Sequence, residues 1–347
     1  MRIQQELPVE PGQDFVVDGF LPRDAPGVAS LFLSIYGNSY PMETYYDPEW
    51  IIQGNAGGSI CTAVARTARG DIVAQGAIFR SSPPNPRLFE LGQFLVLKSY
   101  RRTLAAYEIN RYLAEQVAPR TPLCGYYSEA VCNHTVTQKA TQLTGACEVA
   151  IEMDLMPFDA YRREGATGRV SCVMAYTAIN DQRLDEQTSD NRTRVAYLPA
   201  AYRRELEYLH ADLPARRQLV FDSPQPGDLP SEIARQSFPQ AGVERFQVSR
   251  TGADFAGAAE RLIDRSDAAE VLQWFINTGD PGAPAAAEVL RTLGCFLGGI
   301  VPRWFDSDAL LMQRTRNRPG FESARLLTDK AKWLLHHIRQ DWERTHN

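Results

Sequence analysis

The spacing of apolar residues in the first half of the chain changes between a helical and a strand period. A period of three to four residues predicts helices over Asp24–Tyr36, which Gly37 ends, and over Tyr45–Ile52, which contains the opening pair Asp47-Pro48. Eight further elements follow. The predicted strands are Ser59–Arg66, Ile72–Phe79, Leu88–Leu97, Leu123–Val131, Cys147–Leu155 and Arg169–Ile179, and the predicted helices between them are Leu104–Val117 and Thr135–Thr144.

The second half of the chain repeats the later part of this order. A helix is predicted first, and the order strand, helix, strand, helix, strand, strand and a last helix follows, at Ala200–Leu209, Glu244–Ser249, Asp254–Ile263, Glu270–Ile276, Ala285–Leu293, Cys295–Val301, Ala309–Arg314 and Ala324–Arg344. In both copies a strand ends at an asparagine, Asn133 or Asn277, and the next helix ends at a glycine, Gly145 or Gly294. The sequence therefore predicts an internal repeat.

The length of the chain and one polar stretch predict two domains. A chain of 347 residues exceeds one ordinary core. The segment from Asn180 to Arg194 has almost no apolar residues, so burial cannot offset the entropy of ordering it. We therefore expect an N-terminal domain at 14–180, a linker at 181–194 and a C-terminal domain at 195–347.

Charge and cysteine content narrow the function classes. Lys plus Arg number 37 against 42 for Asp plus Glu, a net charge of −5, which disfavours a general nucleic-acid binder. The six cysteines form no C-x-x-C pair and the five histidines do not fall at ligand spacing with them, which predicts reduced thiols and no metal. No signal peptide or membrane helix is apparent. We expect a cytoplasmic protein without nucleic-acid or membrane partners.

The element order, with the residues Glu90–Ala106, resembles the GCN5-related N-acetyltransferase (GNAT) superfamily. In that family an acidic residue begins the fourth strand, and a Tyr-Arg-Gly-x-Gly-x-Gly/Ala turn leads into a helix. Here the strand begins with Glu90 and the turn reads Tyr100-Arg101-Arg102-Thr103-Leu104-Ala105-Ala106. The resemblance implies an α/β (α+β) fold of two GNAT-like domains, each with a mixed, mostly antiparallel sheet flanked by helices. The C-terminal copy has no basic glycine turn and is expected to be degenerate.

The resemblance also implies acetyl-CoA or another acyl-CoA as co-substrate. Free N–H groups at the turn, where a helix begins, favour the pyrophosphate, and two arginines add charge. Arg102 and Leu104 replace two glycines, so Leu104 has to point away from the ligand. A solvated basic turn that binds nothing is the alternative. The expected cofactor-binding residues are Phe94, Leu95, Val96, Arg101, Arg102, Thr103, Leu104, Ala105, Ala106 and Asn133.

Three side chains are candidates for proton transfer. Glu90 matches the position from which the family's carboxylate accepts the amine proton, with an ordinary surface glutamate as the alternative. Glu129 and His134 flank a strand-to-helix junction and are expected to face one pocket, the carboxylate fixing the imidazole tautomer. His134 could equally bond a backbone carbonyl. Thr141 stands where many members have the tyrosine that protonates the thiolate, which leaves the general acid open.

Other candidates have structural alternatives of equal weight. Tyr36 and Tyr40, within a tyrosine cluster, are predicted to line the acceptor pocket, or simply to pack. Cys132 is a candidate nucleophile, although isolated thiols are usually inert. Asn133 has two readings, a ligand of the pantetheine amides or an N-cap of the next helix.

The leading functional hypothesis is an acyl-CoA-dependent N-acyltransferase, of the EC 2.3.1 class, that acts on a small amine. Two alternatives remain. One is a catalytically silent acyl-CoA sensor or scaffold, which the missing glycines favour. The other is an aminoacyl-tRNA-dependent transferase, for which Arg203-Arg204 and Arg216-Arg217 are the only basic clusters nearby. Whether the halves pair within one chain or in a homodimer stays open.

Overall fold

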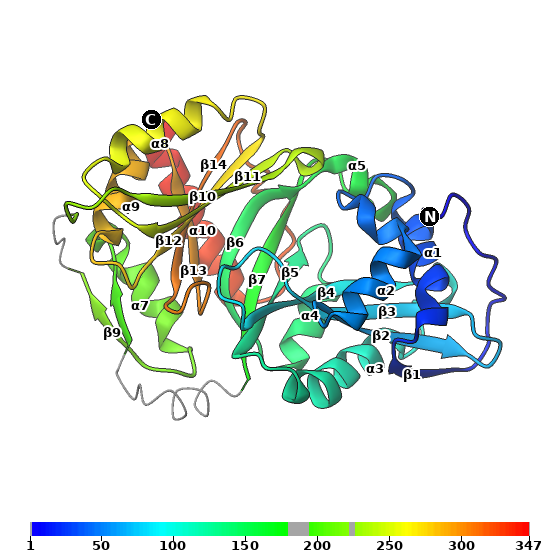
Figure 1. Ribbon diagram of the computed structural model, residues 1–347. Helices are drawn as coiled ribbons and strands as arrows, with labels where there is room; N and C mark the ends of the chain where they lie inside the picture. The colour runs from blue at the N-terminus through cyan, green and yellow to red at the C-terminus, as the bar shows by residue number, and fades with distance from the viewer. Residues whose placement is uncertain (1, 180–193, 222–225, 347) are drawn as a thin grey trace.

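The structure, a computed structural model, describes residues 2–179, 194–221 and 226–346. We call residues 2–179 the N-terminal half and residues 194–346 the C-terminal half. Figure 1 shows the two halves side by side, joined by one twisted sheet that runs through both. The predicted linker, 181–194, lies outside the described residues except for Arg194, so the division into domains stays a prediction.

The N-terminal half contains strands and helices that agree closely with the predicted order. Its strands are β1 (Phe15–Gly19), β2 (Ile60–Thr67), β3 (Ile72–Phe79), β4 (Leu88–Val96), β5 (Gly125–Val131), β6 (Cys147–Met156) and β7 (Val170–Ala178). Its helices are α1 (Ala25–Tyr36), α2 (Pro48–Ala56), α3 (Ala105–Tyr112), α4 (Val136–Leu143) and α5 (Phe158–Tyr161). The predicted helix Leu104–Val117 is α3 followed by a π-helical turn at Leu113–Val117.

The C-terminal half has the second set of elements. Its strands are β8 (Arg194–Tyr197), β9 (Arg217–Val220), β10 (Glu232–Phe238), β11 (Val243–Arg250), β12 (Val271–Asn277), β13 (Phe296–Val301) and β14 (Ala309–Thr315). Its helices are α7 (Arg203–Ala211), α8 (Phe255–Asp264), α9 (Ala283–Thr292) and α10 (Asp329–His346). The prediction that the last helix begins at Ala324 is wrong. The Thr328 hydroxyl accepts a hydrogen bond from the Ala331 amide (3.0 Å), and this N-cap begins the helix later.

Both halves of the chain have strands in the same order and directions, as the predicted repeat requires. Along the sheet the strand order is β1-β2-β3-β4-β5-β7-β6-β13-β14-β12-β11-β10. In the N-terminal half β4 and β5 are parallel, β7 is antiparallel to β5, and β6 is antiparallel to β7. In the C-terminal half β11, β12, β14 and β13 have the same neighbours and directions. The order is therefore a mirrored one, with its centre between β6 and β13.

The junction between the halves is short and depends on one glycine. Strands β6 and β13 pair at Ala150 and Gly299. Gly299 has φ +138°, and a Cβ there would lie 2.4 Å from the Val149 carbonyl oxygen and 2.6 Å from Ala150 Cα. Only glycine fits this close approach. Helix α10 packs against both β6 and β13 and so braces the junction from one side.

Helices cover both faces of the N-terminal sheet. Apolar residues of α1 and α2 pack on one face of β2, β3 and β4, and those of α3 pack on the other. A larger core contains residues of both halves, among them Tyr127 and Val149 with Phe275 and Trp304. The shared core explains why the halves adopt one arrangement. In the part of the chain that is described, no helix has the length and apolar character needed to cross a membrane.

Candidate active site

The parallel strands β4 and β5 separate just where the candidate residues lie. They pair at Leu88, Phe89 and Glu90 of β4, and β5 continues alone with β7. A bulge adds to the separation, because Gln93 has φ +57° and the register between β3 and β4 shifts beside it. The two strands therefore form a wedge that opens beyond Glu90.

The backbone of Val96 faces this wedge. The Leu97 N–H donates to the Val73 carbonyl (2.9 Å), and consecutive residues of an antiparallel ladder point their N–H groups to opposite edges. The Val96 N–H therefore points away from β3, towards the side on which β4 and β5 separate. The side chains of Phe94 and Leu95 pack in the two cores, so these residues offer only their backbone to a ligand.

The turn between β4 and α3 lies at the surface. Leu104 is 64% exposed, so its side chain is not packed into the core beneath the turn. The Thr103 hydroxyl accepts a hydrogen bond from the Ala105 amide (3.2 Å) and donates to the Tyr100 carbonyl (2.7 Å), so it ties the turn to the first residue of α3. Arg102 is exposed, whereas Ala105 is buried and Ala106 is half-buried beneath the turn.

A carboxylate holds one of the two arginines of this turn. The Arg101 guanidinium pairs with Glu164 (2.9 Å), which lies in the segment between α5 and β7. The Asn133 side-chain amide donates to the Glu164 backbone carbonyl (3.1 Å), and the buried Asn133 Oδ1 has no hydrogen-bond partner in the described chain. Asn133 is not the N-cap of α4, because that position belongs to Thr135. Glu164 thus contacts Arg101 and Asn133, two of the predicted cofactor-binding residues.

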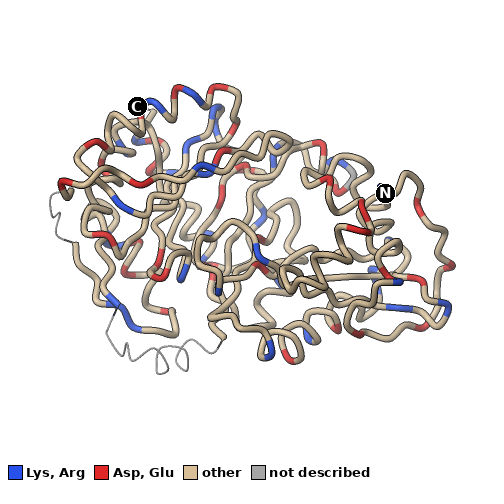
Figure 2. The backbone as a smooth tube through the Cα atoms, viewed as in Figure 1, with Lys and Arg blue, Asp and Glu red and all other residues tan. Residues whose placement is uncertain are grey.

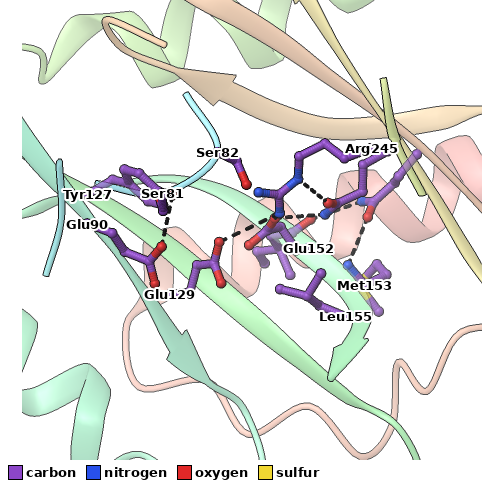
Figure 3. A network of polar contacts seen from close by, with 12 residues as sticks. Ser81, Ser82, Glu90, Tyr127, Glu129, Glu152, Met153, Leu155 and Arg245 are labelled. Atoms are coloured by element: carbon purple, nitrogen blue, oxygen red, sulfur yellow. Dashed lines mark hydrogen bonds and ion pairs between the residues drawn. The ribbon is translucent and has the colours of Figure 1, made fainter. Parts of the chain in front are cut away.

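Glu90 lies at the mouth of the wedge with a defined set of partners. The Tyr127 hydroxyl donates to Glu90 Oε2 (3.0 Å), and the Ser81 hydroxyl lies 2.5 Å from that of Tyr127 (Figure 3). Burial, together with the negative charge of Glu129, raises the pKa of Glu90 to about 8. A carboxylate with such a pKa is a suitable proton acceptor near neutral pH.

Glu129 belongs to a buried charge network and not to a pair with His134. Its carboxylate faces Arg245 of β11 (3.8 Å), and Arg245 also contacts Glu152 of β6 (3.3 Å; Figure 3). Burial raises the pKa of Glu129, which Arg245 opposes. Over residues 2–179, 194–221 and 226–346, no cluster of three or more His, Cys, Asp or Glu side chains is placed to hold a metal ion.

The expected Glu129–His134 pair is therefore wrong. The charged groups that act on His134 are Glu164, Arg101 and Arg325, and burial lowers its pKa. The physical reason is the strand period: Glu129 shares a face of β5 with Tyr127, while His134 follows the end of the strand. The candidate nucleophile Cys132 is buried, which raises its pKa to about 12 and makes it a poor nucleophile.

The tyrosine cluster lies beside the two glutamates. The rings of Tyr36 and Tyr40 are 4.8 Å apart, and the Tyr45 hydroxyl accepts a hydrogen bond from Gln93 (2.5 Å). Burial raises the pKa of Tyr40 well above its usual value, and its tyrosine neighbours, Glu90 and Glu129 raise it further. Tyr40 thus lies within electrostatic reach of both carboxylates, and its ring also packs against Phe32 and Tyr36; its role as a wall of the acceptor site stays a prediction.

The C-terminal half builds part of this site. The Asn85 side-chain amide donates to the carbonyls of Arg303 (2.8 Å) and Phe305 (3.0 Å). The Gln247 amide donates to the Ser82 carbonyl (2.7 Å). These contacts fix the β3–β4 loop and thereby Ser81. Ser81, Arg245 and Glu164 are not among the site residues predicted from the sequence, because each reaches the site through a contact distant in sequence.

The corresponding strands of the C-terminal half stay closed. Strands β11 and β12 pair continuously from Val243 with Val271 to Val248 with Ile276. No wedge opens between them, and the segment before α8 reads Thr251-Gly252-Ala253 without a basic residue. The structure therefore offers one wedge, in the N-terminal half, among the described residues.

Solved structures of acetyltransferases align with about half of this chain. A ribosomal-protein-S5-alanine acetyltransferase from Vibrio fischeri has 9% sequence identity and a TM-score of 0.40, covering 49% of this chain and 96% of that chain. A ribosomal-protein-alanine N-acetyltransferase from Brucella melitensis has 15% identity and a TM-score of 0.38, covering 47% and 99%. Arabidopsis thaliana NAA60, in complex with a bisubstrate analogue, has 11% identity and a TM-score of 0.37, covering 48% and 99%. No family model and no curated protein matches the chain.

The N-terminal half has the architecture that the sequence resemblance implied. Its element order, the acidic residue on β4 and the turn into α3 are all present. Its parallel strands separate beyond that acidic residue. The N-terminal half therefore has the fold features that the sequence resemblance to the GCN5-related N-acetyltransferase superfamily implied.

Proposed function

We propose that the chain is an acyl-CoA-dependent N-acyltransferase, with acetyl-CoA as the donor and a small amine as the acceptor. The observation that carries the proposal is the position of Glu90. Its carboxylate lies where β4 and β5 part, bonded to Tyr127, and Val96 offers an outward N–H farther along the same strand. A buried carboxylate and an outward-facing N–H thus lie along one wedge, which supports the proposal because acyl transfer to an amine requires a base and a carbonyl-polarising donor.

The turn into α3 would hold the pyrophosphate of the donor. N–H groups at a helix start and the positive end of its dipole favour an anion. Arg102 is exposed beside them and adds a charge-assisted contact. The pantetheine arm would then follow β4 into the wedge, with its thioester carbonyl at the Val96 N–H.

The acceptor would enter from the tyrosine cluster. Tyr40 lies within electrostatic reach of Glu90 and Glu129, and Tyr45 within reach of Glu90, and aromatic faces near carboxylates attract an ammonium group. Glu90 accepts a proton from the ammonium, and the free amine attacks the thioester carbonyl. The C–N bond forms, the C–S bond breaks, and coenzyme A leaves as the thiolate, which takes up the second proton that the amine nitrogen loses on becoming an amide.

The release of coenzyme A thiol tests this proposal. Purified chain is incubated with acetyl-CoA and each member of a panel of primary amines, and free thiol is measured with dithionitrobenzoate. We expect thiol release that depends on an amine, together with an N-acetylated amine in the mass spectrum. Binding of acetyl-CoA without thiol release for any amine would instead support the sensor hypothesis.

The tRNA-dependent alternative receives less support from the charges. Figure 2 shows basic and acidic residues mixed over both halves. Of the predicted basic clusters, Arg217 is buried in an ion pair with Asp308 (2.7 Å), and Arg203 pairs with Glu207 (3.3 Å). A backbone of phosphates needs several accessible cations in a row. A small amine therefore fits the described surface better.

Loss of the Glu164 carboxylate is expected to strengthen acetyl-CoA binding. Glu164 competes with the pyrophosphate for Arg101, and the pair is partly exposed, with side chains 43% and 19% accessible. Such a pair contributes up to about 1 kcal/mol, so Glu164→Gln should lower the Kd about two- to fivefold at low salt. Isothermal titration calorimetry measures the change.

The matched control for this titration is Glu207→Gln. It removes a carboxylate from another partly exposed Arg–Glu pair, on α7. The control should bind acetyl-CoA as the unmodified chain does. An unchanged or higher Kd for Glu164→Gln would contradict the competition.

A further inference from the structure

The repeat places an arginine where the N-terminal half has its catalytic glutamate. In the N-terminal half the third pair of the parallel ladder joins Glu90 to Tyr127. In the C-terminal half the third pair joins Arg245 to Gln273. Both β5 and β12 start their antiparallel ladders at the same relative position, Gly125 with Ala178 and Val271 with Thr315, so the two registers correspond. Arg245 is the topological counterpart of Glu90.

Arg245 turns towards the other half. Its side chain is 6% exposed and reaches Glu152 (3.3 Å) and Glu129 (3.8 Å), while its Nε donates to Gln273 Oε1 (2.9 Å). Aromatic rings enclose it, with Phe275 at 5.1 Å and Trp304 at 5.5 Å. A planar guanidinium fits between these rings and the two carboxylates better than an ammonium would.

The positive charge of Arg245 affects the protonation of the buried glutamates at the candidate active site. Three glutamates, Glu90, Glu129 and Glu152, come together from β4, β5 and β6, and Arg245 opposes the rise in pKa of all three. Ser81, Tyr127 and Gln273 hydrogen-bond to these carboxyls, and the titratable side chains of Tyr40, Tyr45 and Cys172 lie within electrostatic reach of them. Without the guanidinium, burial and mutual repulsion would hold these carboxyls protonated.

We propose that Arg245 is a positioning residue for acyl transfer, supplied by the C-terminal half: it fixes the Glu129 carboxylate beside Glu90 and offsets the negative charge of both. The inference rests on the proposed function, since it assigns a role within that site. The C-terminal half would then take part in acyl transfer without binding the donor itself. Its strand β11 supplies the cation, Arg245, that faces the glutamates of the N-terminal half.

The pH profile of kcat/KM tests the proposal. In Arg245→Met the carboxyl pKa values rise, and a base works only when unprotonated, so the rising limb of the profile should move to higher pH. At pH 7 we expect at least about a tenfold loss, since one pKa unit corresponds to a tenfold change, with partial recovery near pH 9. The Kd for acetyl-CoA should not change. Arg245→Lys keeps a charge and should shift the limb less.

The control is Arg235→Met, which removes a guanidinium from the neighbouring strand β10, where Arg235 pairs with Glu244 (2.8 Å). Its profile should match that of the unmodified chain. If the Arg245→Met profile has the same shape as the parent, only scaled down, the residue is merely structural and the proposal is overturned. If Arg245→Met does not fold, the Arg245→Lys variant decides. A rising limb of its kcat/KM profile that does not move at all would overturn the proposal equally. A parent that turns over no amine removes the proposed function itself.

Discussion

Glu90→Gln is expected to lower the rate of amine acetylation by about 10²- to 10⁴-fold while leaving the Kd for acetyl-CoA unchanged. The amide keeps the shape of the side chain and can still accept the Tyr127 hydrogen bond, but it cannot take a proton from the acceptor. The loss should appear in kcat, measured by thiol release with the best amine of the panel.

The pH dependence gives this variant a second readout. The pKa of Glu90 is raised to about 8, so the rate of the parent should rise with pH up to about 8 and then level off, and the variant should lack this limb. The folded chain binds this proton more tightly than the unfolded chain. As the pH rises from 4.5 towards 8, Glu90 therefore ionises in the unfolded chain first, and the free energy of unfolding falls. Gln removes that penalty, and the melting temperature at pH 8 should be equal or higher.

Glu49→Gln on α2, an exposed position, is the control, and it should leave rate and profile unchanged. A Glu90→Gln variant that keeps both the rate and the rising limb would show that another group accepts the proton. A variant with reduced acetyl-CoA affinity would show that Glu90 acts on the donor instead.

Gly299→Ala is expected to destabilise the whole chain. The added Cβ would meet the backbone of Val149 and Ala150, which cannot move without opening the β6–β13 junction, and φ +138° is a region that L-residues rarely adopt. Strain and overpacking together should reduce the free energy of unfolding by at least about 2 kcal/mol. Thermal or denaturant unfolding followed by circular dichroism measures this.

The activity of the Gly299 variant should fall as well, because the junction sets the position of Arg245 and of the residues that hold the β3–β4 loop. Gly168→Ala is the control, since a Cβ there meets nothing within 4 Å. Unfolding of Gly299→Ala at the same temperature as the control would mean that the junction tolerates a side chain, against the geometry described above.

Local signals predicted most of the fold. Helix α1 and strand β3 lie within a residue of their predicted ranges, and Gly145 and Gly294 both adopt positive φ just after a helix, as the repeat required. The missed strands are β1, β8, β9 and β10. Strand β10 is an edge strand whose residues are all exposed or half-buried, so it lacks the buried apolar positions that mark a central strand.

The site was predictable only where it is local. Glu90 and the turn at Arg101–Ala106 lie in one continuous stretch, and a motif could identify them. Arg245 meets Glu152 across 93 positions of sequence, and no local pattern encodes that contact. One signal was present: on β11, Arg245 and Gln247 alternate with Phe246 and Val248, yet all four are buried. A buried strand face with polar residues points to a partner network.

The stoichiometry of acetyl-CoA binding tests the central claim most directly, namely that one wedge, in the N-terminal half, takes the donor. Calorimetric titration should give one site per chain, weaker at high salt and weakened by Arg102→Glu at the exposed turn. Acetyl-pantetheine, which lacks the pyrophosphate, should bind much less tightly. Two equivalent sites per chain, or no binding of acetyl-CoA at all, would contradict the account.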